Sequence, residues 1–307
     1  MNVVYGLDNI PPESTGRAVA VGMFDGVHWG HHAIFQRLLD SSVEGNLDPA
    51  VLTFEQHPAE LLSPTRAPLY INTLDQRIEL MEAAGVRQII VADFNRHFAN
   101  LTHREFASEI LRDTLNARQV VVGSNFRFGK GREGDIRYLS AAAPRLGMTV
   151  IVVPAVIVAG GPVSSTRIRA LISRGDVAGA SKLLGRRFAL RGSVVAGRQI
   201  GRSMGFPTAN LQTAPRQLLP ARGVYAVEVT IARTTYSGVC NIGSRPTFGG
   251  ADESVEVHLT GFQGNIYGET LDVVFCRRIR DEMVFETPEH LADQIRRDLA
   301  RANLPCD

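Results

Sequence analysis

Apolar runs alternate with amphipathic segments along the first 185 residues. Runs rich in Val, Ile and Ala predict buried strands over 18–24, 50–54, 87–94, 118–123 and 149–154. Apolar positions at helical spacing, and a capping box formed by Thr102 and Glu105, predict helices between these strands, over 32–43, 74–84, from 102, and over 135–146. Near-continuous apolar strands that alternate with helices are typical of a parallel sheet covered on both faces. We therefore expect an α/β domain.

The pattern changes after Gly185. Two helices, one starting at Ser164 or Ser165 and one over 176–184, precede a series of strands that no helix interrupts, over 192–197, 224–232, 236–243, 254–262 and 270–279. This succession predicts an antiparallel barrel. Thr287 and Pro288 open a final amphipathic helix that runs to about Arg301. We place the two domains at 1–186 and 187–307.

Composition excludes several classes of protein. The 307 residues are 44% apolar and 21% charged, a composition that excludes a disordered chain. The net charge of +2 does not indicate binding to nucleic acid or to acidic membranes. No apolar run is long enough to span a bilayer, and the start of the chain is not a signal peptide. Three widely spaced cysteines, none in a C-x-x-C pair, exclude a disulfide framework and argue against a zinc site. Free thiols and these absences predict a cytoplasmic location.

The end of the first strand carries candidate chemistry. His28 and His31 follow Gly26 at a predicted strand-to-helix turn, with Gly30 between them. Helix N-termini and backbone N–H groups at such turns favour anions, and glycine lets a phosphate approach the backbone. Spacing alone also allows a metal site or a purely structural turn.

The segment GMFDGVHWGHH (22–32) resembles the HxGH signature of nucleotidylyltransferases, and in particular the prokaryotic bifunctional riboflavin kinase/FAD synthetases. Three further segments match that family in order, TFEQHP (53–58), VVGSNFRFG (121–129) and SSTRIR (164–169). The resemblance implies a Rossmann-like nucleotidylyltransferase domain with a parallel sheet. It also implies transfer of AMP from ATP to FMN, which yields FAD and pyrophosphate.

The resemblance implies roles for particular residues. His28, His31, Asn125 and Arg167 would be catalytic, and His57, Asn125 and Phe126 would bind FMN. ATP would contact Gly22, Phe24, Gly26, His28, His31, Ser164, Ser165, Thr166 and Arg167. Two positions depart from the family pattern, because Gln56 stands where many members have Pro and Asn125 where many have Asp. Asn125 keeps hydrogen bonding but puts a base or metal role in doubt, and His57 can also be a structural turn residue.

The second half lacks the G-x-x-x-x-G-K-[ST] loop common in kinases, and it contains no lysine after Lys182. Residues 205–210, GFPTAN, instead resemble the riboflavin kinase signature, and matching segments follow over 223–226, 241–250, 255–258, 267–268 and 280–282. The resemblance implies a six-stranded antiparallel barrel with a terminal helix. Its ATP site would comprise Gly197, Gly201, Arg202, Gly205, Phe206, Pro207 and Thr208.

In that family pattern Thr208 and Asn210 would bind Mg²⁺, because hydroxyl and amide oxygens suit a hard cation. Glu256 would accept the proton of the riboflavin hydroxyl and, with Tyr225, contact the flavin. A solvated charge at Glu256 and core packing at Tyr225 are the alternatives.

The sequence therefore predicts two consecutive reactions, riboflavin to FMN and FMN to FAD, each using ATP and Mg²⁺. The partners are these small molecules, with no nucleic acid or membrane, and self-association stays open. One alternative keeps a single activity. Another is a flavin-binding protein without turnover or a nucleic-acid-binding barrel, although a basic stripe with interleaved aromatics is lacking.

Overall fold

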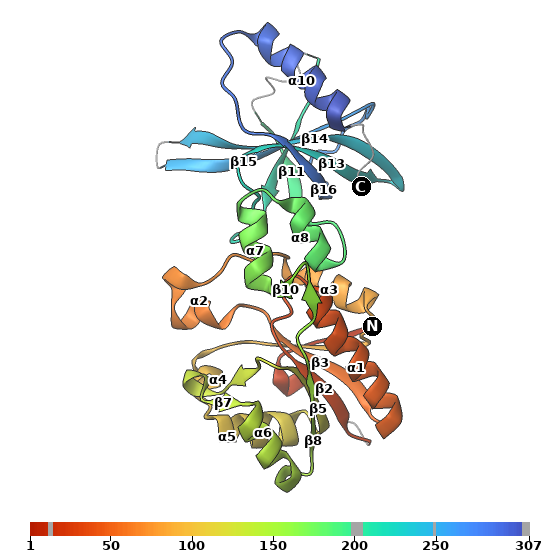
Figure 1. Cartoon of the computed structure of the whole chain (residues 1–307), viewed down its shortest axis with the longest axis vertical. Coiled ribbons are helices and arrows are strands. Elements are labelled where there is room, and N and C mark those ends of the chain that lie inside the picture. Colours follow the sequence, from red (N-terminus) through yellow and green to blue (C-terminus); the bar gives the residue numbers. More distant parts are fainter. Residues whose placement is uncertain (12–14, 198–204, 248–249, 303–307) are drawn as a thin grey trace. The chain divides into compact units, whose positions relative to one another are not determined.

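The computed structural model describes the chain except residues 12–14, 198–204, 248–249 and 303–307, and it gives no side-chain account of 245–252. The chain forms two compact units. Unit 1 comprises Met1–Pro68 and Leu74–Ser164, and unit 2 comprises Leu69–Thr73 and Ser165–Asp307. Each unit has its own sheet and its own core, as the sequence pattern predicts (Figure 1).

Unit 1 is built on a parallel sheet. Its strands lie in the order β1-β4-β3-β2-β5-β8, with bounds β1 (Asn2–Tyr5), β2 (Arg17–Val21), β3 (Asp48–Phe54), β4 (Gln88–Ala92), β5 (Ala117–Gly123) and β8 (Thr149–Val153). All five predicted strands are present. The sixth, β1, lies at one edge of the sheet and was not predicted.

Helices separate these strands and lie beside the sheet (Figure 1). They are α1 (Trp29–Gly45), α2 (Pro58–Leu62), α3 (Leu74–Ala83), α4 (Arg96–Asn100), α5 (His103–Glu105) and α6 (Ile136–Ala142). The Thr102 capping box is confirmed, but the helix that it opens continues as a π-helix, η3 (Phe106–Thr114). Short 3-10 turns are η1 (Leu7–Asn9), η2 (Pro64–Arg66), η4 (Lys130–Arg132) and η5 (Ala143–Leu146), and two small hairpins pair β6 (Arg127–Phe128) with β7 (Gly134–Asp135) and β9 (Ile157–Val158) with β10 (Gly161–Pro162).

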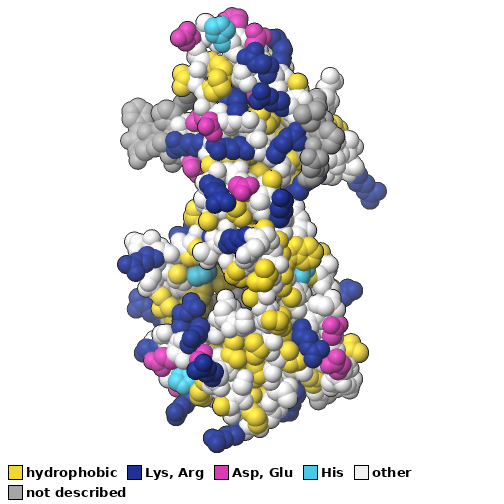
Figure 2. All heavy atoms as spheres, in the orientation of Figure 1, with side chains coloured by type: hydrophobic (Ala, Val, Ile, Leu, Met, Phe, Trp, Pro, Cys, Tyr) yellow, Lys and Arg dark blue, Asp and Glu magenta, His cyan; other side chains and the backbone are white. Residues whose placement is uncertain are grey.

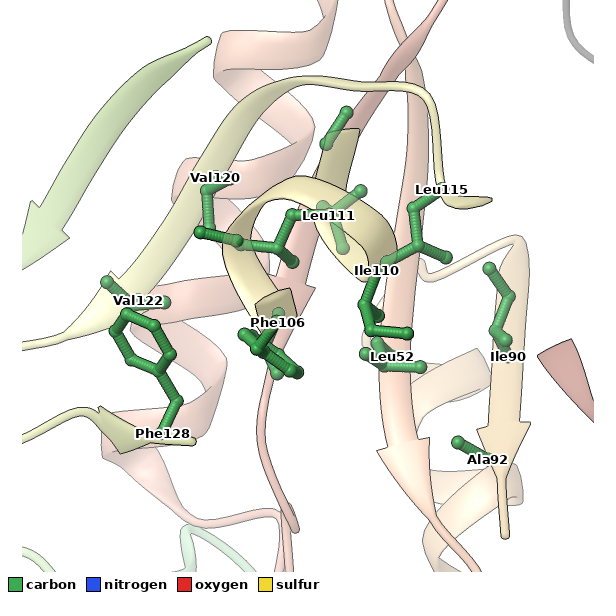
Figure 3. Close-up of a cluster of buried hydrophobic side chains, with 14 of the residues drawn as sticks. Leu52, Ile90, Ala92, Phe106, Ile110, Leu111, Leu115, Val120, Val122 and Phe128 are labelled. Atoms are coloured by element: carbon green, nitrogen blue, oxygen red, sulfur yellow. The ribbon is translucent and has the colours of Figure 1, made fainter. Parts of the chain in front are cut away.

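The central strands β2, β3 and β4 are buried on both faces, which explains why they are almost continuously apolar. Successive residues of a strand enter opposite cores, so that Val120 and Val122 join one cluster and Val121 the other. Figure 3 shows the first cluster, where Phe106, Ile110 and Leu111 of η3 pack against the sheet. Strands buried on both faces therefore lack the alternation of apolar and polar residues that marks a half-exposed strand.

Unit 2 contains a closed barrel in the order β11-β12-β15-β14-β13-β16. The strands are β11 (Ala189–Val195), β12 (Ala209–Thr213), β13 (Gly223–Ile231), β14 (Thr234–Thr247), β15 (Gly250–Leu259) and β16 (Thr270–Arg280), and every pairing is antiparallel. Helices α7 (Ser165–Ser173) and α8 (Val177–Leu184) precede the barrel, and α10 (Pro288–Ala302) follows it. The predicted six-stranded barrel and terminal helix are confirmed, with Pro288 at the first helical position.

Helix α10 packs on the outer face of the barrel, where Val224, Ala226 and Val239 meet Leu299 and Ala302. A buried ion pair fixes the helix there. Arg280 donates to both carboxylate oxygens of Asp298, which is 1% exposed, and the closest N···O distance is 2.8 Å. A paired buried carboxylate of this kind is costly to break, so α10 is an integral part of unit 2.

The short segment Leu69–Thr73 belongs to unit 2 although it lies within the first half of the sequence. Tyr70 forms a parallel bridge with Gln217, and Arg169 donates to the carbonyl of Leu69 at 2.7 Å.

Two other expectations, on the cysteines and on membrane-spanning helices, can be compared with the structure. Cys240 is a free, buried thiol, whereas Cys276 is disulfide-bonded, which corrects the expectation of free thiols only. No helix among the described residues is long and apolar enough to cross a membrane.

Candidate active sites

Three loops meet at one edge of the parallel sheet in unit 1. Strands β3, β2 and β5 are adjacent and parallel, with Leu52 beside Val21 and Ala20 beside Val121. Their carboxyl ends therefore lie together, and ligands of open parallel sheets bind at such edges. The loop after β2 carries the predicted phosphate-binding residues. The loops after β3 and β5 carry those predicted to bind FMN.

The loop after β2 has a strained backbone. Phe24, Gly26 and Val27 adopt positive φ values of 51°, 91° and 36°. A positive φ is unusual for any residue with a side chain and is a clear outlier for a β-branched one. Strain of this kind persists only where the surroundings hold it, and it gathers at functional sites. The loop therefore has one enforced conformation.

Arg77 of α3 provides that enforcement. It is 1% exposed, and its guanidinium donates to the carbonyls of Met23 at 2.8 Å, Phe54 at 3.1 Å and Glu55 at 3.0 Å. One side chain thus joins the loop after β2 to the end of β3. The signal for it was present in the sequence, because Arg77 occupies the apolar stripe of its helix beside Ile78 and Met81. Arg77 is not among the site residues that the sequence predicts.

His28 and His31 lie at the start of α1. His28 is the N-cap, and its Nδ1 accepts a hydrogen bond from the His31 N–H at 3.3 Å. The two imidazole rings stack at 3.6 Å, and the ring of Phe24 meets His31 edge-on at 5.2 Å. A Cβ at Gly30 would lie 3.2 Å from the His28 ring, so glycine allows this close packing. The HxGH spacing therefore produces a compact imidazole pair at a helix N-terminus.

The other two loops present their predicted residues differently. Asn125 is exposed, and Phe126 is half-buried in a turn closed by its N–H to the carbonyl of Gly123. His57 caps α2 through a capping box with Glu60, in which its Nδ1 accepts from the Ala59 N–H at 3.1 Å. This geometry gives His57 the structural turn role that the sequence left open, and binding of FMN by His57 stays a prediction.

The predicted residues of the fourth segment fall on both sides of the unit boundary. Ser164 ends unit 1, whereas Ser165, Thr166 and Arg167 form the first turn of α7 in unit 2. Gly22, from the first segment, directly follows β2 in unit 1. The first turn of a helix offers backbone N–H groups to anions.

The second candidate site is a row of polar residues across the barrel. Glu256 on β15 pairs with Asn210 on β12 and with Asn241 on β14, so the three side chains share one face. Asn210 is buried at 6% exposure, while Glu256 and Asn241 are half-buried. The row occupies the outer face, because alternate residues such as Val255 and Val257 fill the interior.

Glycine gives Asn210 its space. A Cβ at Gly197 would lie 2.0 Å from the Asn210 Nδ2, so the glycine backbone touches this side-chain amide. Thr208 is half-buried just before β12 and shares a strand-like i, i+2 relation with Asn210. Phe206 and Pro207 precede it, after Gly205 at φ 82°. The predicted ATP ligands Gly201 and Arg202 lie outside the described residues.

Tyr225 lies inside the barrel and not in this row. It is 0% exposed, its hydroxyl donates to the carbonyl of Ala221 at 2.5 Å, and its ring meets Phe275 edge-on. Burial raises the pKa of Tyr225 to about 12. Burial, and to a smaller extent the carboxylate of Glu256, also raises the pKa of the Cys240 thiol. These contacts favour the core-packing alternative for Tyr225 and an inert Cys240.

The oxygen donors of the row suit a hard cation. Among the described residues, no group of three or more His, Cys, Asp or Glu side chains could hold a metal ion. Thr208 and Asn210 offer a hydroxyl and an amide carbonyl, which match Mg²⁺ held in part by substrate phosphates. Figure 2 shows basic side chains interspersed with apolar and acidic ones on the face in view.

Comparisons with known proteins cover both halves of the chain. A family model described as FAD synthetase matches residues 10–167, and one described as riboflavin kinase matches residues 184–304. A bifunctional riboflavin kinase/FMN adenylyltransferase of Escherichia coli (strain K12) is 38% identical over 302 residues, 97% of this chain and 96% of that protein. The protein of the same description from Haemophilus influenzae is 37% identical and covers 98% of each chain.

A solved structure, described as a macrolide-efflux protein from Streptococcus pneumoniae, matches with a TM-score of 0.87 at 34% identity. It covers 99% of this chain and 100% of its own. The similarity therefore extends over both units.

Proposed function

Since the chain belongs to the family of bifunctional riboflavin kinase/FMN adenylyltransferases, we propose how its two halves divide the two reactions. The enzyme phosphorylates riboflavin with ATP to FMN, and it then adenylylates FMN with a second ATP to FAD and pyrophosphate. We assign adenylylation to residues 1–186 and phosphorylation to residues 187–307. Both reactions consume ATP, so the cytoplasm is their expected location.

In the adenylylation, a phosphate oxygen of FMN attacks the α-phosphorus of ATP, and the bond to the β-phosphate oxygen breaks. The FMN phosphate is already ionised, so the protein has to orient the reactants and stabilise the departing pyrophosphate. His28 suits this task. Its Nδ1 accepts from the His31 N–H, so Nε2 carries the ring proton and can donate to a phosphate oxygen.

His31 stacks on His28 and lies one turn into the same helix, where we assign it to the same phosphates. The N-terminus of α1 adds a favourable dipole for negative charge. We assign the flavin to the neighbouring loop after β5, with Asn125 as a hydrogen-bonding group and Phe126 as an apolar surface. The hydroxyls of Ser164, Ser165 and Thr166 and the guanidinium of Arg167 are assigned to ATP phosphates by family resemblance and by their chemistry.

In the phosphorylation, the 5′-hydroxyl oxygen of riboflavin attacks the γ-phosphorus of ATP, and ADP leaves. A hydroxyl nucleophile needs a proton acceptor, and we assign this role to Glu256. Thr208 and Asn210 would hold Mg²⁺, which neutralises phosphate charge when it is bound. The side chains of Asn210 and Glu256 are direct cross-strand neighbours, which brings the proposed ion ligand and the proposed base together.

The cross-strand pairing of Asn210 with Glu256 carries this proposal, and separate assays of the two steps test it. Chromatography of reactions with riboflavin, ATP and Mg²⁺ should show FMN and then FAD. Glu256→Gln should abolish FMN formation from riboflavin while supplied FMN is still converted to FAD. The double variant His28→Ala, His31→Ala should do the reverse. Loss of both steps in a folded Glu256→Gln protein would refute the two-site assignment.

A further inference from the structure

His258 follows Glu256 by two residues on β15 and lies on the same outer face of the barrel. The side chain is 9% exposed. Its Nδ1 lies 2.8 Å from the carbonyl oxygen of Pro207, and its ring meets the ring of Phe206 edge-on at 5.7 Å. Both contacts are made with the segment that leads into Thr208. His258 therefore connects the strand of the proposed base to the segment of the proposed metal ligand.

The carbonyl of Pro207 belongs to the peptide that joins Pro207 to Thr208. Pairing between β12 and β15 begins at Ala209 opposite Val257. Continued by one residue, this register sets Thr208 opposite His258, and Thr208 precedes the strand. The His258 side chain takes the place of a backbone partner there and satisfies the Pro207 carbonyl.

The hydrogen bond defines the state of the imidazole. A carbonyl oxygen can only accept, so the proton is on Nδ1 of His258. The ring is also held by packing, because it contacts Phe206 edge-on, and the Arg296 guanidinium of α10 lies over the Phe206 ring at 5.9 Å from its centre. The imidazole thus has one orientation and one donor atom directed at the Thr208 peptide.

We propose that His258 is a positioning residue of the riboflavin kinase reaction, which sets the peptide plane before Thr208 and thereby the position of the Thr208 hydroxyl relative to Glu256. This inference rests on the proposed roles of Thr208 and Glu256. Because His258 and Glu256 are two residues apart on one strand, any shift of the 206–208 segment changes the geometry between the ion ligands and the base. Misplacement of reacting groups by about 1 Å can cost a factor of about 100 in rate.

The test uses substitutions of nearly equal shape at His258 in the full-length enzyme. In His258→Asn, the side-chain Nδ2 occupies the place of the imidazole Nδ1 and can donate to the Pro207 carbonyl. His258→Leu fills the space without a donor. We expect His258→Leu to lower kcat of FMN formation by about 10–100-fold and to raise the Mg²⁺ concentration for half-maximal rate. His258→Asn should restore most of both, and FAD formation from supplied FMN should be unchanged in each.

His290→Leu is the matched control, because His290 is an exposed histidine of α10, and it should leave both reactions unchanged. Equal impairment of His258→Leu and His258→Asn would overturn the inference. So would normal kcat and Mg²⁺ dependence in His258→Leu. If Glu256→Gln or Thr208→Ala stayed fully active, the proposed kinase site itself would fail, which is a distinct result.

A measurement on the unmodified enzyme tests the same inference without any substitution. The ¹⁵N chemical shifts of the His258 ring distinguish the Nδ1–H from the Nε2–H form. The hydrogen bond to Pro207 requires Nδ1–H, and a neutral ring protonated at Nε2 would overturn the inference even if the variants failed to fold.

Discussion

Replacing Arg77 by Met should damage adenylylation more than it damages stability. The guanidinium of Arg77 donates to three carbonyls, and the one on Met23 directly precedes the strained residues of the loop after β2. Methionine keeps an unbranched apolar chain in the buried space and removes every donor. The loop would then be free to leave its positive φ values, and His28 would move with it.

The magnitudes explain why activity should fall first. A hydrogen bond to a charged donor contributes about 1.5–3 kcal/mol, and each carbonyl left unsatisfied costs about 1–3 kcal/mol, so three lost bonds cost roughly 3–9 kcal/mol. Relaxation of Phe24 and Val27 from positive φ returns about 1–3 kcal/mol each. The two contributions largely offset each other. We expect a net loss of about 1–3 kcal/mol in unfolding free energy, with FAD formation reduced by about 10–100-fold.

Arg17→Met is the matched control. Arg17 is equally buried and donates to Gln88 Oε1 and to the carbonyls of Leu115 and Pro11, but it lies at the opposite end of β2 from the loop. The positive φ beside its partners, 48° at Asn116, belongs to a residue type that tolerates the left-handed region, so little strain can relax there. This variant should therefore lose more stability than Arg77→Met while its folded fraction keeps normal KM values for ATP and FMN. The assays are chemical unfolding and steady-state FAD formation, with FMN formation as the internal reference. Full adenylylation activity in Arg77→Met would refute the reasoning.

Two further predictions concern unit 2. Gly197→Ala would place a Cβ 2.0 Å from Asn210 Nδ2. We therefore expect FMN formation to fall at least tenfold, while FAD formation from supplied FMN stays intact. Normal kinase activity in this variant would contradict the role of Gly197. Burial raises the pKa of Tyr225 from 10.0 to about 12, so unfolding exposes a stronger acid. The stability due to this shift is present below pH 10 and is lost as pH rises toward 12, by up to about 2–3 kcal/mol. Unfolding of Tyr225→Phe should lack this part of the alkaline decline, and identical pH profiles of the two proteins would contradict it.

The fold could be predicted where burial determines the pattern. Strands β2 to β5 are buried on both faces, so their apolar runs alone mark them. Strand β1 is a four-residue edge strand with exposed residues at both ends, and its apolar signal is correspondingly weak. The sequence of strand β12 is typical of a loop, because its residues Asn210 and Gln212 are polar and glycines precede it. Its assignment depends on pairing with β11 and β15, which a local pattern does not contain.

The candidate sites divide in a similar way. His28, His31 and Glu256 could be selected from short segments, because their chemistry and their spacing are local. His258 lies on the same strand face as Glu256, but its hydrogen bond to Pro207 spans 51 residues of sequence, so no local pattern indicates a role for it. Arg77 reaches residues 22 to 54 positions away. A hydrogen bond between a side chain and a distant carbonyl is visible in the sequence only as a polar residue within the apolar stripe of a helix.

Arg77 and His258 share one physical action, although they belong to different reactions. Each donates from a buried position to a backbone carbonyl just before a predicted ligand-binding residue, Met23 before Phe24 and Pro207 before Thr208. In a trans peptide the C=O and the following N–H point in opposite directions. A donor that binds the carbonyl therefore sets the direction of the following N–H, which points away from that donor. Backbone amides oriented in this way bind anions without side-chain charge. The chain has only two lysines, Lys130 and Lys182, so oriented backbone amides would share phosphate binding with the proposed arginine and histidine side chains.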